Sequence, residues 1–161
     1  MENKSWKEEF EAKLPIYGHW NWIMVVDKAF PSQVAPGIET IHTGEKLLPV
    51  LDYVSKRIEE SDHIEGVYHT DLEFNYIPKI FPGAPELKEA MDKLFASRGI
   101  TPEPIIHSKI MDDIVEIGKK FKIMFLKTTE VIPYSSVYIY LGCGYWNDEP
   151  TLRALMAQDN L

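Results

Sequence analysis

The sequence is poor in cysteine and in basic residues. It contains a single cysteine, Cys143, which excludes an internal disulfide and a cysteine-rich zinc site. Lys and Arg number 17 against 25 Asp and Glu, and the formal net charge of −8 argues against nucleic acid or an anionic membrane as a partner. One cysteine is typical of a reducing compartment, so we expect a cytoplasmic protein.

Long apolar runs and the common catalytic motifs are also missing. No stretch approaches the roughly 18 uncharged apolar residues of a membrane span, and MENKSWKEEFEAKLP lacks the apolar core of a signal peptide. The sequence contains no GxSxG, GxxxxGK, GxGxxG or HExxH pattern. These absences argue against a nucleophile elbow, a phosphate loop, a dinucleotide site and a zincin helix. We therefore do not expect a bound catalytic metal.

The composition that remains is that of a folded globular chain. With 161 residues, 45% of them hydrophobic, we expect one domain spanning residues 1–161. Apolar runs predict strands over 22–27, 64–70, 121–128 and 135–143, and a strand or loop over 103–108. Amphipathic periodicity predicts helices over 4–13, 44–61, 85–99, 109–120 and, at the end, 149–158. This alternation predicts an α/β fold, a three-layer α/β/α arrangement with a central, largely parallel sheet.

Sites in open α/β sheets gather at the ends of strands, where loops present side chains to a crevice. That rule selects Asp27, His69 or Thr70, His107, and the loop IPYSS at 132–136. His19 and Asp27 stand on either side of the strand over 22–27. Because eight extended residues span about 26 Å, the two can share a ligand only if GHWNW folds back or if subunits complete each other's sites.

Two stretches carry a resemblance to a known family. YGHWNWIMVVDKAFP (17–31) has Gly-His, an apolar strand, and Asp-x-x-Phe-Pro; TTEVIPYSSVYIYLGCGY (128–145) has a Glu and a Tyr stepping into an apolar strand. Both resemble the RbsD/FucU family, the D-ribose pyranases and L-fucose mutarotases, while residues 60–105 match it only loosely. The resemblance implies an RbsD-like fold for the whole chain.

The resemblance also implies an activity. Family members are cofactor-independent isomerases that bind a free monosaccharide and interconvert its anomers, or its pyranose and furanose forms, by acid/base ring opening. A positioned acid and base contributing ~10²–10⁴ in rate suffices for such a reaction, and histidine suits it near neutral pH. The implied catalytic residues are His19, Asp27 and Tyr134. The residues expected to bind the substrate are Trp20, Lys28, His107, Asp112 and Ser136.

The family further implies a ring-type homo-oligomer, such as an octamer or decamer, in which a neighbour supplies the tyrosine that corresponds to Tyr134. The chain departs from the family pattern at several positions. Ser136 replaces the usual asparagine, Thr129 replaces a glycine, and Trp20-Asn21 replaces a polar pair. The second histidine of pyranases, or arginine of fucose mutarotases, aligns near Asp112 or Asp113, with His107 a few residues upstream. These departures leave the sugar open.

Two alternatives stand beside the isomerase. The first is a monosaccharide-binding protein of the same fold without catalytic activity, suggested by Ser136 and by the missing second cation. The second is a metal-assisted enzyme that uses His42, His69 or His107 together with Glu45 or Glu73.

Overall fold

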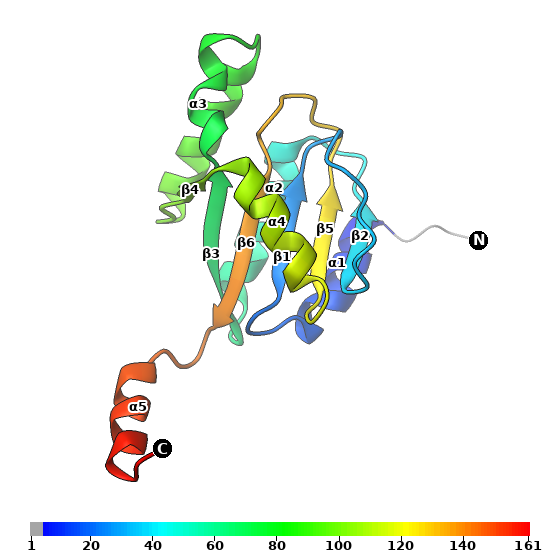
Figure 1. Cartoon of the computed structure of the whole chain (residues 1–161). Coiled ribbons are helices and arrows are strands. Elements are labelled where there is room, and N and C mark those ends of the chain that lie inside the picture. The colour runs from blue at the N-terminus through cyan, green and yellow to red at the C-terminus, as the bar shows by residue number, and fades with distance from the viewer. Residues whose placement is uncertain (1–4) are drawn as a thin grey trace, which may run out of the picture.

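A six-stranded sheet with helices on both faces forms the body of the protein (Figure 1). The structure is a computed structural model that describes residues 5–161. The strand order is β2-β5-β1-β6-β3-β4, and β6 alone runs antiparallel to its neighbours. The strands are β1 (Trp22–Val26), β2 (Ile38–His42), β3 (Ile64–Asp71), β4 (Glu103–Ile105), β5 (Ile123–Lys127) and β6 (Val137–Cys143). The predicted three-layer α/β fold with a largely parallel sheet is confirmed.

The helices divide unequally between the two faces of the sheet. The larger core packs α1 (Trp6–Lys13), α2 (Leu47–Glu60) and α3 (Ala84–Ser97) against one face, and the smaller core packs α4 (His107–Ile117) against the other. Figure 1 shows α4 in front of the sheet with α1 and α2 behind it, and α5 (Glu149–Gln158) beyond the end of β6. Short 3₁₀ turns occupy Leu14–Ile16, Leu72–Asn75 and Ile77–Lys79.

Strand β1 is the centre of the protein, as its uninterrupted apolar sequence predicts. Ile23 and Val25 belong to the larger core, whereas Met24 and Val26 belong to the smaller one. All four side chains are fully buried. Because alternate residues of a strand point to opposite faces, a strand covered on both sides needs apolar residues at every position.

One unpredicted strand and the start of one helix are the informative differences from the predictions. Strand β2 was not predicted, because it lies at the edge of the sheet and its sequence, IETIH, buries only Ile41. Helix α4 begins at His107, two residues earlier than predicted, because the carboxylate of Glu73 accepts a hydrogen bond from the His107 backbone N–H at 3.1 Å. A distant side chain thus performs the capping that the local sequence lacks.

None of the helices within residues 5–161 is both long enough and apolar enough to cross a membrane. The most separate of them, α5, leaves Leu152 and Leu155 exposed.

Candidate active site at the carboxyl edge of the sheet

Three neighbouring strands bring polar side chains to one edge of the sheet, the upper edge in Figure 1. Asp27 follows β1, Asp71 is the last residue of β3, and Ser136 precedes β6, which lies between them. Because adjacent strands are about 4.8 Å apart, the ends of β1 and β3 are about 10 Å apart. We call Asp27, Ser136, Tyr138, Asp71, His107 and Tyr134 the edge cluster.

Asp27 and Ser136 form the first part of the edge cluster. The Ser136 hydroxyl donates to Oδ1 of Asp27 at 2.8 Å and accepts from the Asp27 backbone N–H at 3.0 Å. Ser136 is buried, whereas Asp27 is partly exposed. The serine therefore fixes the carboxylate of Asp27 while its second oxygen, Oδ2, stays without a protein partner among the hydrogen bonds of the described residues.

Asp71, Tyr138 and His107 form the second part. The Tyr138 hydroxyl donates to both carboxylate oxygens of Asp71 at 3.1 Å, and Nδ1 of His107 lies 3.0 Å from Oδ1. Asp71 is 1% exposed and Tyr138 is fully buried, while the side chain of His107 is 29% exposed. The imidazole thus connects a buried carboxylate to the surface of the edge.

A strained turn carries Tyr134 to the same place. Tyr134 follows Pro133 and has a φ of +60°, a conformation that bulky residues rarely adopt. The Ser135 hydroxyl holds this turn by donating to the Ile132 carbonyl at 2.7 Å. The Tyr134 ring meets His107 edge-on, with ring centroids 5.3 Å apart, and is 37% exposed. Strain of this kind is characteristic of functional sites.

Burial sets the electrostatics of the edge cluster. Loss of hydration raises the pKa of Asp71 from 3.8 to about 6, although hydrogen bonds from His107 and Tyr138 act in the opposite direction. Burial, followed by the negative charge of Asp71, raises the pKa of Tyr138 strongly, and the charge of Asp27 adds to this effect. Tyr138 therefore stays a hydrogen-bond donor, whereas Asp71 changes its charge near neutral pH.

This shift predicts how stability depends on pH. A carboxyl whose pKa is raised in the folded state binds its proton more tightly there than in the unfolded chain. Its contribution to stability is therefore complete below the unfolded value of 3.8 and is lost as pH rises through about 6. We expect Asp71→Asn to gain up to about 3 kcal/mol relative to the wild type between about pH 4 and pH 7.

Urea unfolding of both proteins across this pH range measures the difference. Because other titrating groups cancel between the two proteins, a difference that stays constant with pH would contradict the raised pKa of Asp71.

His19 and Trp20 lie at the opposite end of β1. The turn Gly18–Asn21 precedes the strand and is closed by the Asn21 backbone N–H donating to the Gly18 carbonyl at 3.0 Å. The His19 ring contacts Trp20 and Tyr140, and Trp20, with a φ of +78°, is 54% exposed. Since β1 alone is about 16 Å long, His19 and Asp27 do not share a cavity within one protomer. The turn does not fold back over the strand.

Lys28 and Asp112 also take no part in the edge cluster. Lys28 is exposed and uses its backbone N–H, which donates to the Glu130 carbonyl at 2.7 Å. Asp112 is exposed on α4, and Asp113 pairs with Lys109 at 2.8 Å. Ile110 and Ile114 form the buried side of α4, and His107 precedes Ile110 by three residues and Ile114 by seven, so it shares their side of the helix. His107 therefore belongs to the edge cluster, and Asp112 lies away from it.

His42 and His69, the remaining histidines considered as metal ligands, lie far apart in the fold. His42 ends β2 and His69 lies in β3, four strands away, so about 19 Å separates them. His69 packs on Trp22 with centroids 5.6 Å apart, and burial lowers its pKa. In the part of the chain from residue 5 onward, no group of three His, Cys, Asp or Glu side chains is arranged to hold a metal ion. One protomer therefore does not unite His42 and His69 around a metal.

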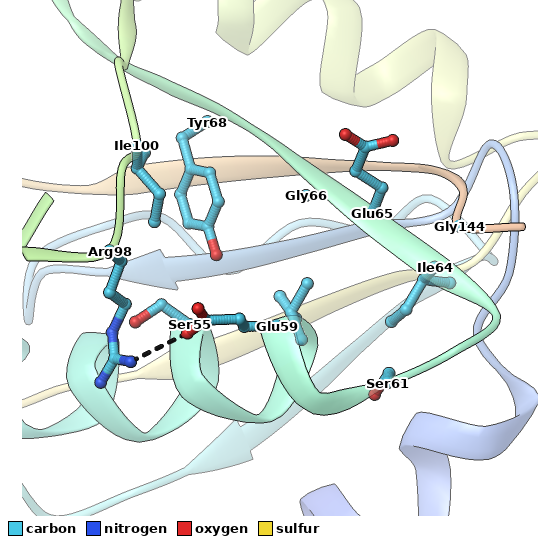
Figure 2. Close-up of a pocket in the computed structure, with 11 residues that line it drawn as sticks. Ser55, Glu59, Ser61, Ile64, Glu65, Gly66, Tyr68, Arg98, Ile100 and Gly144 are labelled. Atoms are coloured by element: carbon cyan, nitrogen blue, oxygen red, sulfur yellow. Dashed lines mark hydrogen bonds and ion pairs between the residues drawn. The ribbon is translucent and has the colours of Figure 1, made fainter. Parts of the chain in front are cut away.

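A cavity of about 440 Å³ lies elsewhere, between α2, β3 and the turn after α3 (Figure 2). Arg98 at its wall pairs with Glu59 at 3.2 Å, and the Tyr68 hydroxyl points into it. Neither Asp27 nor His107 lines this cavity. Because the residues that the family resemblance selected do not line it, we place the candidate active site at the carboxyl edge.

Comparisons with known proteins bear on the fold. No family model matches the sequence, and no curated protein matches it. Solved structures do. RbsD of Bacillus subtilis complexed with D-ribose matches with a TM-score of 0.56 and 17% identity, covering 88% of this chain and 98% of that one. The protein has the RbsD-like fold. The fucose mutarotase of Streptococcus pneumoniae in complex with L-fucose matches with a TM-score of 0.54 and 16% identity, covering 83% of this chain and 91% of that one.

Sequence reasoning missed Asp71 and Tyr138. The predicted strand ended at residue 70, which left Asp71 just outside it. Extending the strand by one residue would have brought Asp71 under the same strand-end rule that selected Asp27. Tyr138 gave no signal of its own, because a tyrosine inside an apolar strand is ordinary core.

Proposed function

We propose that the protein is a cofactor-independent sugar isomerase, a mutarotase or pyranase, whose active site is the edge cluster. One observation carries the proposal: Asp27, His107 and Tyr134 converge at one edge of a fold that is also the fold of a D-ribose complex and of a fucose mutarotase. The two sequence stretches that resemble the RbsD/FucU family contribute two of these three residues. His107 supplies the histidine that the sequence alignment left unassigned.

The chemistry needs an acid and a base on either side of a hemiacetal. A base removes the proton of the anomeric hydroxyl while an acid protonates the ring oxygen, so that the bond between the anomeric carbon and the ring oxygen breaks. The open-chain aldehyde rotates and closes again, and both protons return to where they began. Asp27 and His107 are suited to these two roles, and the phenol of Tyr134 to holding a hydroxyl of the sugar.

His19 enters the proposal as a group from a neighbouring subunit. It is exposed, it belongs to the Gly-His stretch of the family resemblance, and it lies too far from Asp27 to act in the same protomer. In a ring-type homo-oligomer, the His19 turn of one subunit would cover the edge cluster of the next. The strained, exposed Trp20 beside it would then contact either the sugar or the neighbouring subunit.

Saturation-transfer NMR tests the activity. We expect the wild-type protein to accelerate exchange between the anomers or ring forms of at least one of a panel of pentoses and hexoses, D-ribose and L-fucose included. His19→Ala should return the exchange to the uncatalysed rate. No acceleration for any sugar, together with intact sugar binding, would instead identify a binding protein of the same fold.

Mixing two inactive variants tests the shared site. If subunits complete each other's sites, oligomers reassembled from His19→Ala and Asp27→Asn chains contain some sites with both groups intact and regain part of the activity. Each variant reassembled alone is the control and should stay inactive. Mixed oligomers without activity, or a strictly monomeric wild type by size-exclusion chromatography, would contradict the shared site.

A further inference from the structure

Asp71 is a buried carboxylate that the proposed acid/base chemistry does not use directly. It is 1% exposed, and its two partners are the Tyr138 hydroxyl, at 3.1 Å from each oxygen, and Nδ1 of His107, at 3.0 Å. A carboxylate removed from water at this depth is costly unless its hydrogen bonds are satisfied. Tyr138 and His107 satisfy them, so the three side chains form one unit.

We propose that Asp71 is a positioning residue that fixes the tautomer of His107, so that Nε2 is the ring nitrogen presented to the sugar. The inference rests on the proposed function. An ionised carboxylate only accepts hydrogen bonds, and a neutral imidazole has one N–H and one lone pair. With the N–H on Nδ1 directed to Asp71, the lone pair belongs to Nε2. Nε2 then serves as the base for the anomeric hydroxyl.

Three further residues fix the position of His107, one through its backbone and two through its ring. The backbone N–H of His107 donates to both carboxylate oxygens of Glu73, at 3.1 and 3.2 Å, which fixes the first residue of α4. The rings of Tyr134 and Phe30 meet the imidazole edge-on, with centroids 5.3 and 6.3 Å away. These contacts set the orientation of the ring, whereas Asp71 alone chooses which nitrogen carries the proton.

The proton balance needs His107 and Asp27 together. Nε2 takes the proton of the anomeric hydroxyl, so that His107 becomes an imidazolium whose positive charge faces the Asp71 carboxylate, while Asp27 acts as the acid and gives a proton to the ring oxygen as its bond to the anomeric carbon breaks. On ring closure, Nε2 returns its proton to the anomeric oxygen, and Asp27 takes back the proton of the hydroxyl that closes the ring. Above about pH 6, where Asp71 is ionised, it keeps its charge throughout the reaction and does not contact the sugar. It acts in the manner of the carboxylate that orients histidine in a hydrolase triad.

Histidine ¹⁵N NMR of the free protein tests the tautomer. Replacing Asp71 by alanine would leave the Tyr138 hydroxyl buried without a partner, so the better variant is Asp71→Leu combined with Tyr138→Phe, which removes both polar groups. In the wild type we expect His107 with its proton on Nδ1. In the double variant we expect the Nε2-protonated form to appear. Glu73→Gln is the matched control, because it alters the capping of α4 and should leave the tautomer unchanged.

Kinetics provide the second readout. We expect the double variant to lose about 100-fold in kcat for anomer exchange with KM little changed, and Asp71→Glu to recover part of the loss. A His107 tautomer that is the same in the wild type and the double variant would overturn the proposal, as would a changed tautomer with unchanged kcat. A wild type that exchanges no sugar refutes the proposed function, and the NMR result then decides separately whether Asp71 controls His107.

Discussion

Replacing His107 by alanine should lower catalysed ring exchange by ~10²–10⁴, the range expected for loss of a positioned acid or base. His107 lies between the buried carboxylate of Asp71 and the partly exposed ring of Tyr134. Its Nδ1 is 3.0 Å from Oδ1 of Asp71, and its ring centroid is 5.3 Å from that of Tyr134. With Nδ1 directed to Asp71, its Nε2 is the ring nitrogen left to exchange a proton with a sugar. Saturation-transfer NMR with the sugar that the wild type prefers measures the loss.

A matched control exists on the same helix. Asp112 is exposed on α4, and it lies away from the side that carries His107, Ile110 and Ile114. Asp112→Ala should therefore leave the exchange rate within about twofold of the wild type, although the sequence alignment gave Asp112 the same standing as His107. Equal losses in the two variants, or no loss in His107→Ala, would remove His107 from the chemistry.

Gly37→Ala should destabilise the protein by about 4 kcal/mol or more. A Cβ at Gly37 would lie 2.2 Å from the Phe121 carbonyl oxygen and 2.7 Å from that of Gly118, distances that real Cβ atoms do not reach. Gly37 is also bonded through its own backbone, since its N–H donates to Gly118 and its carbonyl accepts from Ile123. Backbone cannot move aside as a flexible side chain does, so the clash strains the start of both β2 and β5.

Gly142→Ala is the control for this prediction. A Cβ there would meet only the Glu65 carbonyl oxygen, at 3.8 Å, which is ordinary van der Waals contact. We expect that variant to unfold in urea within about 1 kcal/mol of the wild type. A Gly37→Ala variant as stable as Gly142→Ala would contradict the close approach of Gly37 to the backbone carbonyls of Phe121 and Gly118.

The sequence predicted the fold well because the sheet is covered on both faces. Strand β1 is apolar at every position because both of its faces are covered. Its sequence, WIMVV, is therefore recognisable as a strand without knowledge of the strands that pair with it. Strand β2 was invisible for the opposite reason. It pairs only with β5 and buries Ile41 alone. Glu39 is partly exposed and His42 is exposed, so the sequence of β2 resembles that of a loop.

The candidate site was only partly predictable. Asp27 and Ser136 are 109 residues apart in the sequence, and the strand-end rule selected both because each adjoins a predicted strand. That β1 and β6 are neighbours at this edge became visible only in the structure. The sequence left both His107 and Asp112 as candidates for another reason. The helix was predicted to start at residue 109, and only the capping carboxylate of Glu73, 34 residues away, makes His107 its first residue.

His19 shows where a single chain stops being informative. It lies in the same family-like stretch as Asp27, yet the two residues stand at opposite ends of β1. The resemblance implies a role for both residues and does not imply that they act within one subunit. The geometry of β1 raises the possibility that they act in neighbouring subunits, because the strand between them is itself about 16 Å long.

The most direct test of the edge cluster as the active site is a crystal structure of the protein soaked with the sugar that it exchanges fastest, or with D-ribose and L-fucose in parallel. We predict the sugar at the carboxyl edge of the sheet, with hydroxyl groups within hydrogen-bond distance of Oδ2 of Asp27 and Nε2 of His107. A sugar bound instead in the cavity beside Tyr68 and Arg98, with the edge cluster empty in every subunit, would contradict the account.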